Sequence, residues 1–350
     1  FFFLSCSTYI FADEFIVKLS KNQTFQSSFT ALSSNKETKI IDQHELGNLV
    51  LIDFIEDGQV SSKKIQALQK SINAEYIVPN IKIHTFNDFP NDPSYEKQWA
   101  LEKIEAAKAW GIQRGNSAIT VAVIDTGIDW EHEDLKQQIW QNPNETPSNG
   151  VDDDDNGYVD DIRGWDFFAD DSDPMDETSS KNPGHGTHCA GIIGSVGDNG
   201  IGVSGIAQNV TLMPIRFLGA DGSGDLMGAT KSVDYAVDNG ADIISASWGA
   251  AVGKQQMQPV LDAIQRANEK GILFIAAAAN DGKSNDVREV YPANANFPNV
   301  ISVAASGPED EKPSWSNYGR AKVDLASPGL NILSTLPNDS YGNLSGTSMA

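Results

Sequence analysis

Three side chains, far apart in the sequence, could together activate a serine hydroxyl. Asp125 ends the apolar run Val-Ala-Val-Ile, His185 stands among Gly and Thr residues, and Ser348 follows the dipeptide Gly-Thr. A serine hydroxyl is a weak nucleophile at neutral pH, so it needs a base to take its proton and an acid to fix the tautomer of that base. These residue types predict a relay in which Asp125 orients His185 and His185 activates Ser348.

The three motifs, in the order Asp, His, Ser and with these small neighbours, resemble those of subtilisin-like serine proteases. The resemblance implies a peptidase that forms an acyl-enzyme on Ser348. On residue type alone, His188 competes with His185 and Asp129 competes with Asp125. His185 and Asp125 match the family motif, so we interpret His188 as a structural histidine and Asp129 as a surface or packing acid.

The resemblance also implies residues that stabilise the oxyanion and bind the substrate. Asn280, in the run Ala-Ala-Ala-Ala-Asn-Asp-Gly, is expected to be the side-chain oxyanion donor. Backbone N–H groups at the start of a helix that carries Ser348 are expected to assist it. Two segments are expected to pair with an extended peptide: Gly222, Ser223 and Gly224, and Ser247, Trp248 and Gly249.

The primary specificity pocket is expected between Ala279 and Val290. The family usually has Gly where Ala279 stands, and Val290 occupies a position at the pocket floor where a small residue is common. Both residues add methyl groups to the pocket. Such changes alter the discrimination between substrate side chains by only ~1–3 kcal/mol. The expected specificity is a preference for small or medium apolar residues over Phe and Tyr.

An acidic run at 152–161 has the donor spacing of a calcium loop. Oxygen donors alternate before Gly157 and continue after it, at Asp152, Asp154, Asn156, Asp160 and Asp161. Ca²⁺ prefers several oxygen ligands from such loops, and crowded carboxylates repel one another unless a cation neutralises them. The full EF-hand pattern with its terminal Glu is absent, and a solvated acidic loop is the alternative. We expect structural Ca²⁺ here.

A second calcium site is implied by the resemblance alone. In the family, a calcium ion lies between the first segment of the domain, an acid after the catalytic Asp and a loop after the catalytic His. The matching ligands are Asp92, Asp134 and Asn199, with backbone oxygens near Ile201 and Val203.

Charge and composition exclude several classes of partner. The chain of 350 residues has 25 Lys and Arg against 48 Asp and Glu, a formal net charge of −23, and residues 89–350 hold 17 against 38. Such a surface repels nucleic acid and anionic membranes. The two cysteines, Cys6 and Cys189, are too few for a disulfide framework, and no apolar run approaches the ~20 residues of a membrane span.

The second part of the chain alternates apolar strand-like runs with helical patterns. Strands are expected at 119–124, 213–217, 243–245, 272–277 and 300–304, and helices at 228–239 and 256–269. This alternation predicts an α/β fold with a mostly parallel sheet covered by helices on both faces. The resemblance implies that the fold is subtilisin-like. Ligands bind at the carboxyl ends of such strands, where Asp125 is expected to lie.

The first part of the chain is predicted to contain a separate unit. Residues 1–12 are interpreted as the remnant of a secretory signal, so the protein is expected to be secreted or extracytoplasmic. Residues 13–86 form a small α+β unit that resembles the propeptide of subtilases. Strands are expected at 14–19, 49–55 and 74–86, the last broken at Pro79, with a helix at 61–71 capped by Ser61.

Two further boundaries follow from the resemblance, which begins near Asn91. Residues 87–95 are expected to form a linker that contains the processing site, and 96–350 the peptidase domain. In the family a long helix follows the catalytic serine, so the C-terminal part of the fold is expected to be missing after Ala350.

Together these observations predict a secreted, calcium-stabilised serine endopeptidase made as a zymogen. Its partners are expected to be protein or peptide substrates and its own propeptide, an intramolecular inhibitor, and we expect a monomer. The alternative is a non-catalytic, calcium-binding surface domain that retains the fold. A cysteine-dependent enzyme is disfavoured, because Cys189 lies in a predicted buried helix and a buried thiol is usually inert.

Overall fold

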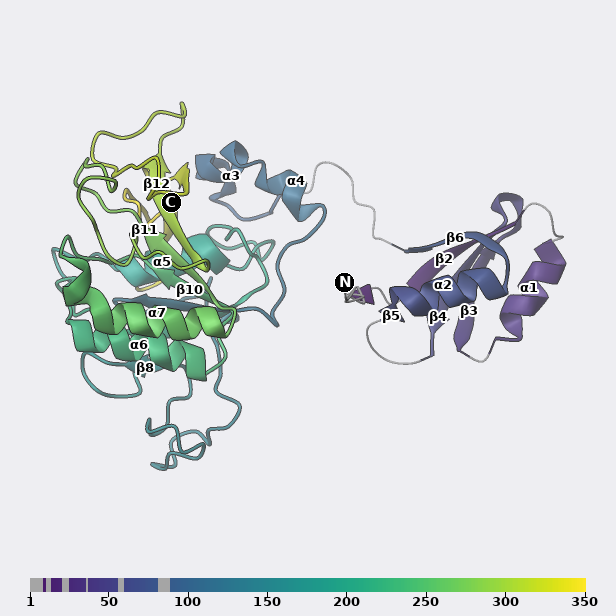
Figure 1. Cartoon of the computed structure of the whole chain (residues 1–350), viewed down its shortest axis with the longest axis horizontal. Coiled ribbons are helices and arrows are strands. Elements are labelled where there is room, and N and C mark those ends of the chain that lie inside the picture. Colours follow the sequence, from purple (N-terminus) through teal and green to yellow (C-terminus); the bar gives the residue numbers. More distant parts are fainter. Residues whose placement is uncertain (1–8, 11–13, 21–24, 36, 56–59, 81–88) are drawn as a thin grey trace, which may run out of the picture. The chain divides into compact units, whose positions relative to one another are not determined.

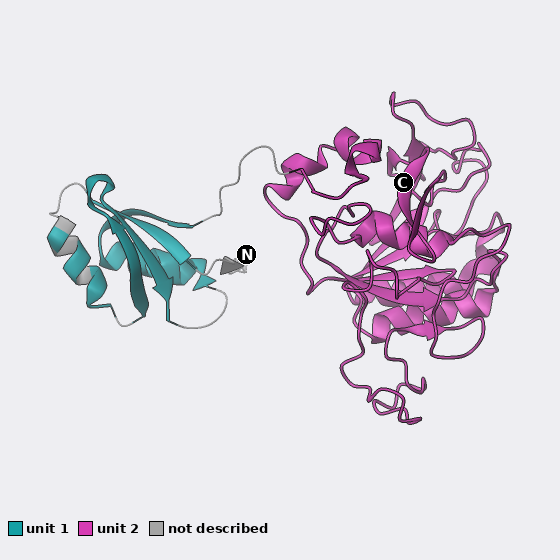
Figure 2. Ribbon diagram, turned by 180° about the vertical axis from the view of Figure 1, so that it is seen from behind, with its two compact units in different colours: residues 1–84 teal, residues 85–350 magenta. Residues whose placement is uncertain are grey.

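The computed structural model describes residues 9–10, 14–20, 25–35, 37–55, 60–80 and 89–350. The chain divides into two compact units, residues 1–84 and 85–350, which Figure 2 shows in different colours. Each unit is described by itself.

The first unit is a four-stranded antiparallel sheet with two helices. The sheet order is β3-β4-β2-β6, built from β2 (Glu14–Leu19), β3 (Thr38–His44), β4 (Leu49–Phe54) and β6 (Ala74–Pro79). The helices are α1 (Phe25–Ser33) and α2 (Ser62–Ser71), with a short helix η1 (Glu45–Gly47). A two-stranded pair joins β1 (Tyr9–Ile10) to β5 (Val60–Ser61). One buried cluster contains residues of the sheet and of both helices, so both helices cover the same face.

The predicted helix at 61–71 and strands at 14–19 and 49–55 are confirmed to within a residue. The Ser61 hydroxyl accepts a hydrogen bond from the Lys64 N–H at 3.3 Å and caps α2, and Ile65 and Leu68 are buried. Helix α1 and strand β3 were not predicted. The expected strand residues after Asn80, and most of 1–12, lie outside the described residues.

The second unit is built on a seven-stranded parallel sheet with the order β13-β12-β11-β10-β7-β9-β8. Its strands are β7 (Thr120–Asp125), β8 (Trp165–Asp166), β9 (Thr211–Arg216), β10 (Ile243–Ala246), β11 (Leu273–Ala277), β12 (Val300–Ser306) and β13 (Leu325–Pro328). The predicted parallel α/β sheet is therefore confirmed.

Helices cover both faces of this sheet. Helices α6 (Leu226–Asp238) and α7 (Gln258–Glu269) lie side by side on one face (Figure 1). Helix α5 (His185–Gly194) packs on the other face, against β7, β9 and the hairpin strand β14 (Ile332–Leu336), which pairs with β15 (Ser340–Leu344). The remaining helices are α3 (Trp99–Lys103), α4 (Ala106–Trp110), η2 (Tyr95–Lys97) and η3 (Lys254–Met257).

The apolar run of β7 follows from this two-sided burial. Successive strand residues point to opposite faces. Ala122 and Ile124 belong to the core cluster under α6 and α7, whereas Val121 and Val123 pack in the cluster that contains Ala190 of α5. A strand buried on both faces needs apolar residues at every position, so it shows no alternation.

Strand order places Asp125 where the connections diverge. Strand β7 lies between β9 and β10, with α5 before β9 on one face and α6 after it on the other. Such a point leaves a crevice at the carboxyl ends of the strands. Asp125 is the last residue of β7 and lies at this crevice.

Among the described residues, no helix is long and apolar enough to cross a membrane.

Candidate active site

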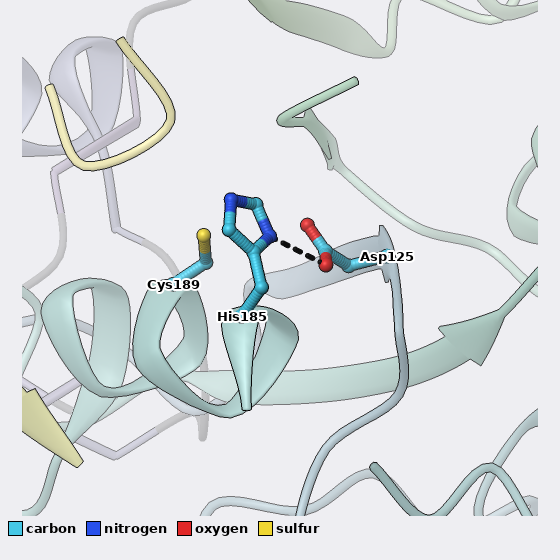
Figure 3. A group of neighbouring side chains, drawn as sticks. All are labelled: Asp125, His185 and Cys189. Atoms are coloured by element: carbon cyan, nitrogen blue, oxygen red, sulfur yellow. Dashed lines mark hydrogen bonds and ion pairs between the residues drawn. The ribbon is translucent and has the colours of Figure 1, made fainter. Parts of the chain in front are cut away.

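Asp125 and His185 form a hydrogen-bonded pair at the crevice (Figure 3). Asp125 is 1% exposed, and its Oδ1 lies 2.7 Å from Nδ1 of His185, the first residue of α5. The Thr126 N–H donates to the same oxygen at 2.7 Å. A carboxylate accepts, so Nδ1 carries the proton and Nε2 is left as the basic nitrogen.

The surroundings of His185 make it a stronger base than an ordinary histidine. Burial disfavours the charged imidazolium, but the negative charge of Asp125 and its hydrogen bond outweigh this effect and raise the pKa of His185. The arrangement is therefore suited to accept a proton from a nearby hydroxyl.

The start of α5 fixes the position of His185. Asn182 Oδ1 accepts hydrogen bonds from the N–H groups of Gly184 and His185 at 3.1 and 2.8 Å. Gly184 has a φ of 110°, and a Cβ there would lie 2.1 Å from Cδ of Pro337. Only glycine fits at this position, which explains the Gly before the histidine.

Asp176 joins the two catalytic elements, and sequence reasoning missed it. Its Oδ1 accepts the Thr126 hydroxyl at 2.8 Å, and its Oδ2 accepts the N–H and hydroxyl of Thr187 at 2.9 and 2.7 Å. Thr126 follows Asp125, and Thr187 lies in α5. Burial raises the pKa of Asp176 to about 6, although these hydrogen bonds oppose the shift. Its loop is rich in acids, so no motif distinguished it.

Ser348 makes no hydrogen bond to Asp125 or His185 in the described part of the chain, and its contacts are with Ser247 and Cys189. Its hydroxyl donates to the Ser247 carbonyl at 3.2 Å, and its carbonyl accepts from the Ser247 hydroxyl at 3.2 Å. The Cys189 thiol, one helical turn after His185, lies 3.5 Å from the same Ser348 carbonyl. Catalytic hydrogen bonds are often long before substrate binds.

The expected helix that carries Ser348 is not observed within residues 89–350. Thr347 and Ser348 form a turn instead. The Met349 N–H donates to the Gly346 carbonyl at 3.1 Å. A helix beginning at Ser348 would take its first hydrogen-bond donors from beyond Ala350, so this stretch cannot contain it.

Hydrogen bonds from Thr347 hold the oxygen end of the Asn280 side chain and leave its amide NH₂ to donate elsewhere. Its Oδ1 accepts the N–H and hydroxyl of Thr347 at 2.9 and 3.1 Å. The amide NH₂ group therefore faces away from Thr347, and within the described chain it has no protein acceptor. A Cβ on Gly346 would lie 3.5 Å from Asn280 Nδ2, so this donor is close to the segment that carries Ser348.

The expected substrate-binding segments follow β9 and β10, the two strands that flank β7. Gly222, Ser223 and Gly224 are exposed in the loop between β9 and α6, and Ser247, Trp248 and Gly249 follow β10. The Trp248 and Phe217 rings pack edge to face, with their centroids 5.0 Å apart. Both segments thus lie at the crevice where β7 ends.

Val290 lies close to the second segment. Ala250 and Tyr291 exchange two backbone hydrogen bonds of 2.8 and 3.0 Å, and Val290 is buried next to Tyr291. Ala279 has a φ of 87°, a left-handed conformation that favours glycine. This conformation gives a physical reason for the glycine that the family usually has there.

The competing residues have structural roles. His188 is fully buried, its Nε2 lies 3.0 Å from the Gly342 carbonyl, and burial lowers its pKa to about 4. Asp129 Oδ2 accepts the Asn338 N–H at 2.8 Å. Cys189 lies close enough to Asp125 and His185 to share a metal ion (Figure 3), but burial keeps its pKa well above the ordinary value, so the thiol stays protonated.

The acidic run brings part of the predicted calcium set together. Asp152 and Asp154 have carboxylate oxygens within 4.8 Å of one another and of Glu145, which was not predicted. Asn156 Oδ1 accepts the Tyr158 N–H at 2.8 Å. Asp160 accepts two backbone N–H groups, and Asp161 is fully buried with three side-chain donors.

The second predicted calcium set also converges. Asp134 accepts the Asn199 side-chain amide at 2.7 Å and the Val203 N–H at 3.0 Å, and Asp92 accepts the Asn199 N–H at 3.1 Å. The Ile201 N–H donates to Asn199 Oδ1 at 2.7 Å. Burial raises the pKa of Asp92, and raises that of Asp134 to about 6. Neither buried carboxylate forms an ion pair within the part of the chain that the structure describes, and such a pair fits a cation.

Comparison with known proteins identifies the family. The model of the Subtilase family matches residues 116–350. Thermitase of Thermoactinomyces vulgaris is 37% identical over 262 residues, which cover 75% of this chain and 81% of thermitase. The thermophilic serine proteinase of Bacillus sp. (strain AK1) is 32% identical over 340 residues, which cover 96% of this chain and 74% of the relative.

A solved structure leads to the same family. The crystal structure of a cold adapted subtilisin-like serine proteinase matches with a TM-score of 0.53 and 29% identity, over 69% of this chain and 74% of that one. The resemblance inferred from the three motifs and the subtilisin-like fold are confirmed. The chain belongs to the subtilase family and is a serine endopeptidase.

Proposed function

We propose that this subtilase is a secreted, calcium-stabilised endopeptidase, made as a zymogen, that cleaves peptides through an acyl-enzyme on Ser348. The observation that carries the catalytic assignment is the 2.7 Å contact between Asp125 and His185, at the strand edge where Ser348 also lies.

The reaction follows from the roles of these side chains. His185 Nε2 takes the Ser348 proton as Oγ attacks the peptide carbonyl carbon, and Asp125 stabilises the imidazolium that forms. The Asn280 amide and nearby backbone N–H groups stabilise the oxyanion. His185 then protonates the leaving amine. Water, activated by the same histidine, hydrolyses the ester and restores the Ser348 hydroxyl.

Substrate recognition uses the two segments that follow β9 and β10. An extended peptide adds its backbone to Gly222–Gly224 and to Ser247–Gly249, which gives affinity without strict sequence demands. The residue before the cut enters the pocket beside Ala279 and Val290. The added methyl groups favour small or medium apolar side chains there.

The first part of the chain has the role of a propeptide in this proposal. Residues 1–12 belong to a secretory signal, residues 13–86 inhibit the peptidase, and cleavage occurs within residues 87–95. The peptidase is then released as a monomer.

Calcium has a structural role in this proposal. Asp92, Asp134 and Asn199 hold one ion, with backbone oxygens near Ile201 and Val203, and the acidic run at 152–161 holds another. The buried carboxylates of Asp92 and Asp134, which form no ion pair in the described chain, fit such an ion. The metal neutralises charge and takes no part in the reaction.

Ser348→Ala tests the catalytic assignment. The full chain with this change is expected to lose peptide cleavage, to remain uncut near residues 86–92 and to resist labelling by a serine-directed fluorophosphonate. Ser345→Ala is a matched control, because Ser345 lies three residues earlier and is exposed. Labelling or normal processing of the Ser348→Ala protein, in the absence of another protease, would contradict the proposal.

A further inference from the structure

The acidic run at 152–161 lies against a carboxylate from an earlier segment. Glu145 is 8% exposed, and one of its oxygens, Oε1, accepts the Asp153 N–H at 2.8 Å. Its other oxygen, Oε2, is buried and has no hydrogen-bond partner among the described residues. A buried, unpartnered carboxylate oxygen is costly unless a cation or donor satisfies it.

Glu145 approaches two carboxylates of the run. Carboxylate oxygens of Glu145, Asp152 and Asp154 all lie within 4.8 Å of one another. No Lys, Arg or His in the described part of the chain forms an ion pair with any of the three. Three carboxylates at this distance repel one another, so the arrangement needs a positive charge.

We infer that Glu145, Asp152 and Asp154 hold a Ca²⁺ ion, and that Asp160 and Asp161 support the site without binding the metal. The inference rests on the proposed calcium dependence and specifies which residues provide it. Calcium suits this set because all the donors are carboxylate oxygens on a loop, whereas nitrogen or sulfur ligands would suit zinc.

The exposure of the run agrees with this assignment. Asp152, Asp154 and Asn156 are half-buried, whereas Asp153 and Asp155 are exposed. The loop is also held in shape by its own backbone, because Asp152 accepts the N–H groups of Asn156 and Gly157 at 3.1 and 2.8 Å. Asp152 and Asp154, the two half-buried acids at the start of the run, are therefore the ones that lie close to Glu145.

Asp160 and Asp161 lie outside this group of three carboxylates, and their hydrogen bonds connect the run to other parts of the chain. Asp160 accepts the N–H groups of Asn149 and Gly150 at 3.0 and 2.9 Å. Asp161 accepts the side chains of Asn142 and Asn156 at 2.8 and 3.1 Å, together with the hydroxyl of Tyr235 in α6. These bonds attach the calcium loop to the core.

The experiment measures cation binding in the full chain that carries Ser348→Ala, which prevents self-cleavage. Asp134→Asn is added to remove the other proposed calcium site. Tb³⁺ is the luminescent probe, excited through tryptophan, and Ca²⁺ competition gives the affinity. Glu145→Gln keeps the shape of the side chain and removes its charge. Asp155→Asn is the matched control, since Asp155 is exposed and its φ of 56° suits Asn.

Glu145→Gln is expected to weaken Ca²⁺ binding at least tenfold, and Asp155→Asn to change it less than twofold. Asp154→Asn provides a second test if Glu145→Gln melts at a lower temperature in chelator. Unchanged affinity in both Glu145→Gln and Asp154→Asn would overturn the inferred ligand set, as would equal losses in Glu145→Gln and Asp155→Asn. A parent protein that binds no Ca²⁺ would instead reject calcium binding by this loop, and neither result bears on Ser348 catalysis.

Discussion

The charge of Asp125 controls the basicity of His185. Asp125 Oδ1 takes two hydrogen bonds, from His185 and Thr126, while its buried Oδ2 has no partner in the described chain. His185 must be neutral to accept a proton, and its pKa is raised. Activity is therefore expected to fall as the pH decreases through this raised pKa.

Asp125→Asn should lower kcat/KM by ~10⁴, because it removes the charge and permits the wrong tautomer of His185. The residual activity should have its acid limb at lower pH, since the main effect that raises the histidine pKa is lost. The measurement is kcat/KM against pH. Asp129 is a second buried acid nearby, and Asp129→Asn should leave the acid limb of the pH profile in place. An unmoved limb in Asp125→Asn would contradict this account.

Ala279→Gly should stabilise the peptidase unit by up to about 1 kcal/mol. A left-handed conformation costs an L-residue ~1–2 kcal/mol, and the greater freedom of Gly in the unfolded chain offsets part of the gain. The measurement is unfolding in urea. Ala278→Gly is the control: Ala278 is fully buried, lacks a positive φ and should lose stability. A loss in both variants would argue against strain at Ala279.

The sequence could predict residues that stand in distinctive surroundings. Asp125, His185 and Ser348 each have small neighbours that a tight turn or close packing requires, and the structure gives the reason at Gly184. Asp176 and Glu145 lie in loops with many acids. Their importance comes from contacts across the fold, such as Asp176 with Thr126, and no local pattern encodes such contacts.

At the level of elements, Asp176 links strand β7 to helix α5. Its folded-state pKa, about 6, is above the ordinary 3.8, so the folded protein binds this proton more tightly than the unfolded chain does. The resulting stability is fully present below about pH 4 and is lost as the pH rises through about 6. Ionisation of Asp176 therefore lowers the stability of the folded protein.

Comparison with Asp176→Asn isolates this effect. The free energy of unfolding of the wild type, relative to the variant, should fall between pH 4 and 6 by up to about 3 kcal/mol and then stay constant. Urea unfolding at four pH values measures it. The variant should also lower kcat more than it raises KM, because the amide has one acceptor oxygen where the carboxylate has two, so either Thr126 or Thr187 loses its acceptor. A difference independent of pH would show that Asp176 has an ordinary pKa.

Helix α7 and helix α1 show why some elements were predictable. In α7, Val260, Ile264 and Ala267 recur on one face, and all three are buried. In α1, the hydroxyls of Thr30 and Ser33 donate to backbone carbonyls four residues earlier. Such side-chain bonds compete with the backbone hydrogen bonds of a regular helix. Tertiary packing, including buried Leu32, stabilises α1, and sequence periodicity does not reveal it.

At the scale of the whole molecule, charge is unevenly distributed. Residues 89–350 contain 21 more acids than Lys and Arg residues, so many carboxylates have no basic partner. Repulsion among them destabilises the compact state, and salt screens it. All seven tryptophans lie in this part of the chain, so tryptophan fluorescence reports on the unfolding of the peptidase unit alone.

Calcium and sodium should therefore stabilise this unit to different extents. In the Ser348→Ala chain with chelator, NaCl is expected to raise the melting temperature modestly by screening. CaCl₂ at the same ionic strength should raise it further, because binding to the folded state adds ~2.7 kcal/mol per site at a hundredfold excess over Kd. For a unit of this size that corresponds to roughly 5–10 °C per site. Equal melting temperatures in the two salts would mean that screening alone acts, and a decrease in NaCl would mean that attractive ion pairs outweigh the acidic repulsion.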